Sequence, residues 1–441
     1  AMQGVIAGSR TLLSWLGPTR QQSQLRILVL TTIVAGSLVA IGAGASLSAF
    51  DGRIAGADPV FAALWVVAAC CALGAAQQAK FHRLAAVVLL SGTGFVTCIT
   101  FLWLSAPDLA LTQLLVEVVT TVLLLLGLRW LPKRAQGIHS TNAGALLRAR
   151  LRRGLDFVIA LVAGLAVTGI SFLVMTSPAP ETISSFFLDK SYTEAGGRNV
   201  VNVLLVDFRA FDTLGEITVL GIVGLTIFAL LRRFRPAAES LSAPEQQTRQ
   251  RVFDERHEAR TSDETIVDYL MIPRVIMQWL FPVIVVFAIH LFLRGHDLPG
   301  GGFIAGITMS IAFILQYMAS GTRWVETRLR ILPLRWIGIG LLISAITGVA
   351  SILFGYPFLT TSFQYVELPV LGKIPLASAL IFDFGVFVLV VGATVLMLIA
   401  LAHQSIRAPR VIETASDAEQ EADAEPAPER DDVVPAEEGA R

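Results

Sequence analysis

The sequence predicts an all-α polytopic membrane protein with about ten transmembrane helices. Three observations support this. The composition is 54% hydrophobic and only 15% charged, unlike that of a soluble domain. Apolar runs of the roughly 20 residues that cross a bilayer recur along the chain. Lys and Arg gather in alternate loops. The formal net charge is zero and by itself indicates no partner, and nucleic acid is not an expected one.

The apolar runs place the predicted helices in chain order. The first five lie near residues 27–47, 60–76, 84–104, 109–128 and 155–175. A sixth covers residues 200–231, and the last four lie near 272–293, 302–318, 336–354 and 374–402. Cys70, Cys71 and Cys98 all fall inside these runs, so neither a disulfide framework nor a zinc site is expected.

The basic residues predict that both termini are cytoplasmic, because Lys and Arg concentrate in cytoplasmic loops. With a cytoplasmic N-terminus, the outer loops hold only Arg53, Lys190, Arg198, Arg294 and Lys373, while the inner loops hold dense basic clusters. Multi-pass insertion in a bacterial inner (cell) membrane follows. Ala1 precedes Met2, which suggests an expression or processing scar.

Two polar stretches lie outside the predicted helices, one between the sixth and seventh and one after the tenth. Residues 232–265 are rich in Arg, Glu and Gln and are predicted to be a linker. The acidic, Pro-containing residues from Arg407 onward are expected to be disordered. Neither a P-loop nor a G-x-G-x-x-G motif occurs, so the energy for any transport must come from a gradient or a partner, and no cofactor is expected.

Glu117 is the first candidate for ion transfer. It lies about eight residues into the fourth span, roughly 12 Å deep, where a carboxylate is costly. A polar stripe at helical spacing accompanies it, formed by Asp108, Thr112, Gln113, Thr120 and Thr121. Such a stripe must face protein or water. Glu117, Gln113 and Thr121 are therefore candidate ion-path residues, and the alternative is a structural carboxylate that is protonated or hydrogen-bonded to a neighbouring helix.

Charged residues crowd the start of the sixth span, where Asp207, Arg209, Asp212 and Glu216 follow one another within ten residues. Arg209 is spaced to pair with Asp212 at i+3. Glu216 lies about 6 Å inside the outer boundary and is the one that is surely immersed. All four are candidates for ion translocation. For Asp207 and Arg209 the alternative is an interfacial ion pair.

Asp383 is a second deep acid, about nine residues into the last span. The surrounding helix is apolar, so an ion-path role and a structural role carry equal weight. Gly385 and Gly392 follow it and would let another backbone approach closely. His290, near the outer end of the seventh span, is predicted to be a hydrogen-bonded interfacial histidine.

A glycine-rich loop, residues 294–303, joins the seventh and eighth spans. Gly300, Gly301 and Gly302 permit a tight re-entry into the membrane. Gly302 and Gly306 then form a G-x-x-x-G pattern that favours close helix packing. These four glycines are predicted to serve assembly rather than ion binding.

Long stretches of the chain resemble a known family. "SAPDLALTQLLVEVVTTVLLLL" around Glu117 and "NVLLVDFRAFDTLGEITVLGIVGL" around Glu216 resemble the C-terminal part of the large A subunit of Mrp-type multisubunit Na+/H+ antiporters. "FPVIVVFAIHLFLRGHDLPGGGFIAG", residues 281–306, resembles the B subunit of the same complex. The chain thus looks like the end of an A subunit fused to a B subunit.

The resemblance implies a division into six parts. Residues 1–50 would end the antiporter-like region, 51–135 form a three-helix module with Glu117, 136–235 a two-helix module with Glu216, 236–268 a cytoplasmic linker, 269–406 a four-helix B-like module and 407–441 the acidic tail. The antiporter-like core, with its lysine-bearing broken helices, is missing. The chain should therefore be one subunit of several, with other Mrp subunits and the lipid bilayer as partners.

The family implies an ion transporter rather than an enzyme, exchanging cytoplasmic Na+ for external protons. Glu117 and Glu216 match acids that matter in the family, as proton or Na+ relay sites, and Asp383 would shape a cation path; transient Na+ is the only metal expected. One alternative is the equivalent membrane subunit of a complex-I-like respiratory or membrane-bound hydrogenase complex. Another is a purely structural assembly subunit, in which no ion visits the acids.

Overall fold

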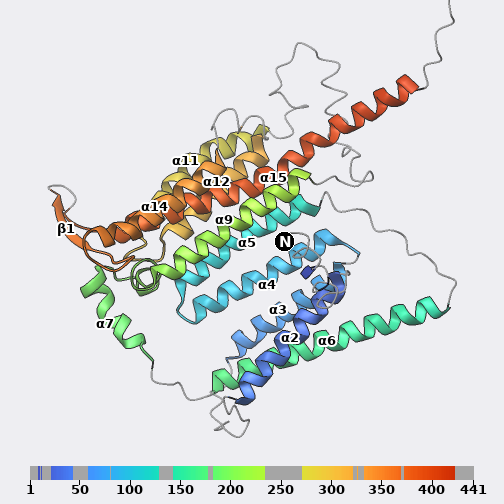
Figure 1. Ribbon diagram of the computed structural model, residues 1–441, viewed down its shortest axis with the longest axis horizontal. Helices are drawn as coiled ribbons and strands as arrows, with labels where there is room; N and C mark the ends of the chain where they lie inside the picture. The colour runs from blue at the N-terminus through green and yellow to red at the C-terminus, as the bar shows by residue number, and fades with distance from the viewer. Residues whose placement is uncertain are drawn as a thin grey trace, which may run out of the picture. The chain divides into compact units, whose positions relative to one another are not determined.

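The computed structural model describes the long helices and one hairpin of the chain (Figure 1). The described residues are 8, 9, 11, 21–42, 58–79, 81–128, 143–176, 182–233, 271–320, 325, 332–368 and 372–422. The chain forms two compact units, one of residues 1–58 and 134–183 and the other of residues 59–133 and 184–441. The predicted linker, residues 236–268, lies outside the described residues.

Ten helices in the described ranges are long and apolar enough to cross a membrane. They are α2 (Gln21–Gly42), α3 (Pro59–Gln78), α4 (Arg83–Trp103), α5 (Pro107–Leu128), α6 (Ala143–Thr176), α9 (Ala210–Arg233), α11 (Met271–Arg294), α12 (Gly302–Ser320), α14 (Pro333–Leu353) and α15 (Ser378–Ala422). The prediction of a helical protein with about ten spans is confirmed.

The first unit is built on the pair α2 and α6. Arg26 of α2 forms an ion pair with Asp156 of α6, Nε to Oδ1 at 2.5 Å, and Gln22 Nε2 donates to the other carboxylate oxygen at 2.7 Å. Farther along, Gly36 faces Ile170 across the same pair. These contacts give the Asp156 carboxylate partners on the neighbouring helix and fix how the two helices are aligned.

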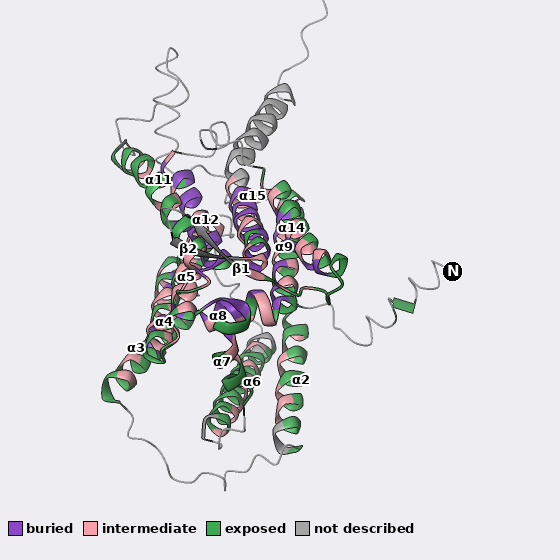
Figure 2. Ribbon diagram, turned by 90° about the vertical axis from the view of Figure 1, so that its left-hand side faces the viewer, coloured by how far each residue is buried: buried purple, intermediate pink, exposed green. Residues whose placement is uncertain are grey.

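The centre of the second unit is formed by α12 and α15. In each of them 72% of the most apolar window is buried inside the chain, whereas the corresponding share is 11% in α5 and α11 (Figure 2). Gly340 of α14 and Gly385 of α15 are so close that a Cβ on either would lie within 2.7 Å of the other's carbonyl oxygen. Small residues let these backbones approach, as is common for helices that pack in membranes.

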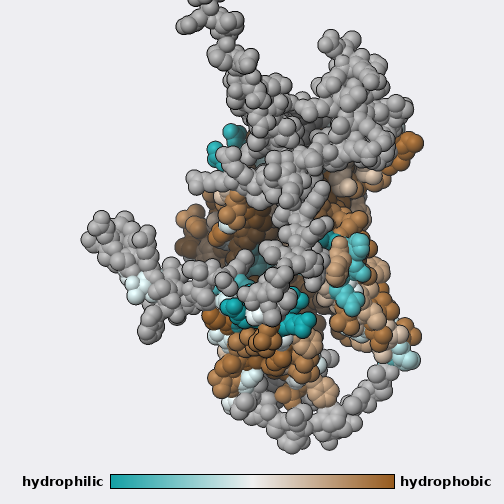
Figure 3. Space-filling view, turned by 90° about the vertical axis from the view of Figure 1, so that its right-hand side faces the viewer, coloured by the Kyte–Doolittle hydropathy of each residue, from teal (hydrophilic) through white to brown (hydrophobic). Residues whose placement is uncertain are grey.

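Large apolar side chains remain exposed on the outer helix faces. Examples are Leu353 at 81%, Trp279 at 77% and Val39 at 72% of their full exposure. Figure 3, which views the molecule from one side, shows hydrophobic residues over much of the described surface. Such a surface would be unfavourable in water but carries no penalty against lipid or another membrane protein.

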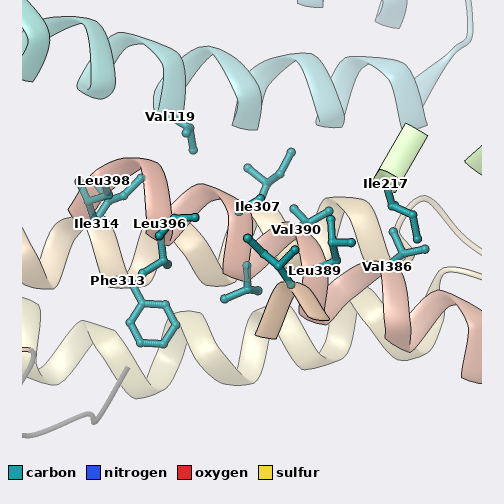
Figure 4. Close-up of a cluster of buried hydrophobic side chains, with 14 of the residues drawn as sticks. Val119, Ile217, Ile307, Phe313, Ile314, Val386, Leu389, Val390, Leu396 and Leu398 are labelled. Carbon is teal, nitrogen blue, oxygen red and sulfur yellow. The ribbon is translucent and has the colours of Figure 1, made fainter. Parts of the chain in front are cut away.

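One hydrophobic core joins the part that resembles an A subunit to the part that resembles a B subunit. Val119 of α5 and Ile217 of α9 belong to the same buried cluster as Ile307 of α12 and Leu389 of α15 (Figure 4). The acid-bearing helices α5 and α9 are therefore held by direct packing against α12 and α15. Because Glu117 lies two residues before Val119 on α5, this packing also fixes the position of the Glu117 backbone.

The sixth predicted helix is not continuous, which corrects the expected span of residues 200–231. It begins as α8 (Val200–Val203), passes through the π-helical turn η2 (Leu204–Phe208) and continues as α9. Thr213 Oγ1 donates to Leu205 O at 2.7 Å across this break. A π turn disturbs the regular backbone pairing, and the hydroxyl satisfies a carbonyl group there.

Several shorter elements lie outside the predicted spans. The helix α7 (Ser184–Ala195) precedes α8, and an antiparallel hairpin of β1 (Phe363–Leu368) and β2 (Gly372–Ala377) precedes α15. α15 continues to Ala422, so the disorder expected from residue 407 is not found over residues 407–422. Ala and Glu favour helix there. Residues 423–441 lie outside the described ranges.

Candidate functional site

Glu117 faces α4 across the α4–α5 contact, and its side chain is half-buried. A Cβ built on Gly94 of α4 would overlap the carboxylate oxygen Oε2 of Glu117. The carboxyl group therefore lies directly against the backbone of α4. The described residues form no hydrogen bond or ion pair with it. The group is thus held in place by shape and remains free to exchange partners.

Polar contacts flank Glu117 along the α4–α5 contact. On one side, Ser91 Oγ and Thr121 Oγ1 lie 2.6 Å apart. On the other, the buried Cys98 Sγ donates to Ala110 O at 3.1 Å. Of the predicted stripe, Gln113 is half-buried and Thr120 is exposed. The stripe is thus divided between faces of α5, and only Glu117 and Thr121 are placed against α4 by a described contact.

Asp212 and Glu216 lie on an exposed face of α9. Arg209 Nη2 and Asp212 Oδ2 form the ion pair expected from their spacing, at 2.5 Å. Glu216 lies about one turn farther on, also exposed, inside the span from Ala210 to Arg232. An acid at this depth requires protein or water beside it, since lipid cannot solvate it.

Asp207 lies in the preceding π-helical turn η2. It is half-buried and receives a hydrogen bond from the Thr361 side chain, next to the β1–β2 hairpin. Burial raises the pKa of Asp207, while the Thr361 hydrogen bond and the nearby His296 oppose that rise. The ion pair that the structure gives to Arg209 is the one with Asp212.

Asp383 is almost fully buried, with 5% of its surface exposed. Its Oδ2 accepts a hydrogen bond from the backbone N–H of Gly302 at 2.7 Å. A Cβ on Gly302 would overlap the main-chain oxygen of Asp383, and one on Gly306 would lie 2.9 Å from Val390 Cβ. The G-x-x-x-G pair of α12 therefore contacts α15 at Asp383 and beyond it along the helix.

A second carboxylate is tied to the same glycine loop. Asp108 Oδ1 accepts from the backbone N–H of Gly300 at 3.1 Å and from Asn199 Nδ2 at 3.3 Å. Asn199 Nδ2 also donates to the carbonyl oxygens of Gly295 and Leu298, both at 3.0 Å. These bonds connect α5, the start of α8 and the loop before α12.

The structure places most of the predicted site residues in three groups: Glu117 with Thr121, Glu216 with the Arg209–Asp212 pair, and Asp383 with the loop glycines. Asp207, beside Thr361, and Gln113 of α5 belong to none of them. No described hydrogen bond or ion pair joins one group to another. No cluster of three or more His, Cys, Asp or Glu that could hold a metal ion occurs among the described residues.

Sequence reasoning missed Gly94, Ser91 and Asn199. The position of Asn199 before an apolar helix was a signal for a helix cap, and its side chain does accept from Asn202 N. Gly94 and Ser91 had no comparable signal, because their role depends on which face α4 turns toward α5.

Comparisons with known proteins match this arrangement segment by segment. Residues 66–133 match the family described as the D subunit of MBH, residues 151–248 the family described as the E subunit of MBH, and residues 272–396 a domain related to the MnhB subunit of Na+/H+ antiporter. The chain is 42% identical over 125 residues to the B subunit of the Na(+)/H(+) antiporter of Bacillus subtilis (strain 168), covering 85% of that protein and 28% of this chain. This chain belongs to the Mrp antiporter family.

Within the Mrp family the chain is an A–B fusion. It is 59% identical over 414 residues, 94% of this chain, to a probable K(+)/H(+) antiporter A/B subunit of Rhizobium meliloti (strain 1021). It spans only 41% of that relative's length. The structure of the Mrp complex from Dietzia sp. DQ12-45-1b is similar, with a TM-score of 0.68 and 27% identity over 91% of this chain and 41% of that chain.

Proposed function

We propose that this chain is a subunit of a multisubunit monovalent cation/proton antiporter in the bacterial cell membrane. The observation that carries the proposal is the collinear match over 94% of the chain to an antiporter A/B subunit. The relatives' names include both Na+ and K+. The cation is therefore proposed as a monovalent metal ion, with Na+ the first to test and other Mrp subunits as partners.

Glu117 is the proposed proton-transfer group of the A-like part. Its carboxyl is half-buried, lies against Gly94 and has no fixed partner among the described residues. An acid that only held helices together would be expected to have such a partner, because an unpaired buried polar group is costly. These features support an ion-path role over a structural one.

Glu216 and the Arg209–Asp212 pair are proposed to face a neighbouring protein of the complex and to pass a cation or proton there. The support is their exposure on α9 inside the span, where lipid would penalise an acid. Asp207 is proposed to act at the same end, beside the hairpin. Gln113 and Thr121 are proposed to line the path at Glu117.

Asp383 and the glycines of the loop are proposed to join the two parts of the chain. The hydrogen bond from Gly302 and the contact of Gly306 with α15 support a packing role for Gly300, Gly301, Gly302 and Gly306. A contribution of Asp383 to a cation path is proposed alongside this role, because its second oxygen remains available for a passing ion.

Topology and domain division are also proposals. The excess of Lys and Arg in alternate loops supports cytoplasmic termini. The division at residues 50, 135, 235, 268 and 406 is proposed as well. The family matches to residues 66–133 and 272–396 each lie within one proposed part, whereas the match to residues 151–248 extends past residue 235 into the proposed linker.

The test of this function is cation-driven proton movement in everted vesicles that carry the whole complex. We expect Glu117→Gln to lower the rate at least about tenfold for Na+ and K+ alike, since an amide cannot exchange a proton. Glu194→Gln, which removes an exposed acid of α7, is the matched control. Wild-type exchange by an assembled Glu117→Gln complex would remove Glu117 from the ion path and favour a purely structural role for this chain.

A membrane component of a hydrogenase-like complex is the second candidate, favoured by the matches to the D and E subunits of MBH. The two functions differ in what drives the ions. An imposed cation gradient suffices for an antiporter, whereas the second candidate requires an electron donor. Exchange that starts only after such a donor is added would favour the hydrogenase-like function.

A further inference from the structure

The Glu117 carboxyl fits directly against the backbone of α4 because residue 94 is a glycine and has no side chain. A Cβ on Gly94 would overlap Oε2 of Glu117 and lie 3.0 Å from Oε1. What it would meet is the end of a flexible side chain rather than backbone. Alanine at this position would therefore turn the carboxyl aside and leave the two helices in contact.

Next to the contact between Gly94 and Glu117, the hydroxyl groups of Ser91 and Thr121 form a pair. Ser91 Oγ is 2.6 Å from Thr121 Oγ1 and 3.2 Å from Val87 O. Ser91 can donate to Val87 and accept from Thr121, or donate to Thr121 instead. Each hydroxyl has one proton and two acceptor positions, so both orders of hydrogen bonds are available.

The Gly94–Glu117 contact and the Ser91–Thr121 hydroxyl pair both lie where α4 packs against α5. Thr121 follows Glu117 by four residues on α5, and Ser91 precedes Gly94 by three residues on α4. Side chains at these spacings lie on the same helix face. The hydroxyl pair is therefore one turn from the carboxyl, toward the Leu128 end of α5.

From this geometry we infer that Gly94 is a positioning residue that holds the Glu117 carboxyl in line with the Ser91–Thr121 hydroxyl pair, and that this pair carries protons between Glu117 and the Leu128 end of α5. The inference rests on the proposed antiport function and names its proton route. Glu117 and Thr121 form no direct hydrogen bond, so water between them takes the proton from the Glu117 acid and gives it to Thr121 Oγ1, while Thr121 passes its own proton to Ser91. Ser91 releases one to water, so both hydroxyls end neutral.

The first experiment measures cation-driven proton movement by the whole complex in everted vesicles. Gly94→Ala should lower the rate about tenfold or more without loss of assembly on a native gel, because the carboxyl is displaced. Gly127→Ala is the matched control, since a Cβ there meets nothing within 4 Å. Adding Glu117→Asp to Gly94→Ala shortens the acid by one methylene and should raise the rate above that of Gly94→Ala.

The second experiment tests the hydroxyl pair independently of Gly94. Thr121→Val keeps the shape and removes the hydroxyl, whereas Thr121→Ser keeps the hydroxyl. We expect Thr121→Val to lower the rate about tenfold or more and to change its pH profile, and Thr121→Ser to stay near the wild-type rate. Equal rates for the two variants would overturn the relay.

The outcomes separate this inference from the proposed function. Wild-type exchange by Glu117→Gln would contradict the proposed role of Glu117 itself. Lost exchange in Glu117→Gln with full exchange in Gly94→Ala would overturn the positioning role alone. If Gly94→Ala prevents assembly and Glu117→Asp does not restore it, Gly94 is a packing residue and its positioning role is rejected.

Discussion

Single contacts decide what each acid of this chain can do. Glu117 lies against a glycine and has no described partner, whereas Asp383 accepts a 2.7 Å hydrogen bond from Gly302 N. Glu216 lies on an exposed helix face. Three acids with the same carboxyl chemistry thus differ in their hydrogen-bond partners and exposure, and residue identity alone does not reveal this difference.

Asp383 gives a prediction about stability. Asp383→Ala should lower the free energy of unfolding by about 2 kcal/mol, since the buried N–H of Gly302 loses its acceptor. Asp383→Asn keeps an acceptor oxygen and should cost less than half as much. Thermal unfolding of the purified complex measures both. Equal losses for the two variants would argue that the hydrogen bond contributes little.

At the scale of elements, the π turn η2 places Asp207 against Thr361 and His296 rather than against Arg209. Arg209 and Asp212 then remain together on the outside of α9. Neighbouring charges on either side of the break therefore have different partners. The same break links α8 and its cap Asn199 to the glycine loop.

Asp207 gives a prediction about pH. Its pKa is raised in the folded chain, so the folded state holds this proton more tightly than the unfolded state does. The acid therefore stabilises the fold least at high pH, and stability should fall as pH rises from its ordinary pKa of about 3.9 to the raised folded value. Asp207→Asn should remove this fall.

The measurement is thermal unfolding of the complex across that pH window. Asp189→Asn, at an exposed acid of α7, is the control and should keep the wild-type slope. A wild-type slope in Asp207→Asn would contradict the prediction.

The elements that sequence could predict are those with a strong local signal. Ten apolar runs gave ten helices, because each run satisfies its own backbone and needs no partner to be recognised. The η2 turn, α7 and the β1–β2 hairpin were missed, since short segments depend on contacts far along the chain, such as Thr361 with Asp207. Gly94 escaped notice because the rotation of α4 about its axis is set by packing.

At the scale of the whole molecule, the B-like bundle is the part with most of the buried surface. α12 and α15 contribute most of the core, and α5 and α9 pack on them. The exposed face of α9 around Glu216 carries Val219 and Val223 as well. An acid inside an apolar exposed face is expected where a second membrane protein covers it.

This face gives a prediction about assembly. A photo-crosslinking side chain at Val219 should form an adduct with another protein of the complex, because lipid beside the Glu216 carboxylate would be unfavourable. Mass spectrometry of the adduct identifies the neighbour. Val174, exposed on α6, serves as the comparison position. Adducts with lipid alone at Val219 would show that no protein covers this face.

The loop before α12 also bears on how this chain tolerates mutation. Gly295, Gly300 and Gly302 would each bring a Cβ onto backbone atoms, and Gly301 has a φ of +96° with Asn202 against it. Every other amino acid carries a Cβ, so any missense change in these four codons is disfavoured whatever residue it encodes. This short loop is therefore a concentrated mutational target, while the surrounding apolar faces can drift among Leu, Ile, Val and Phe.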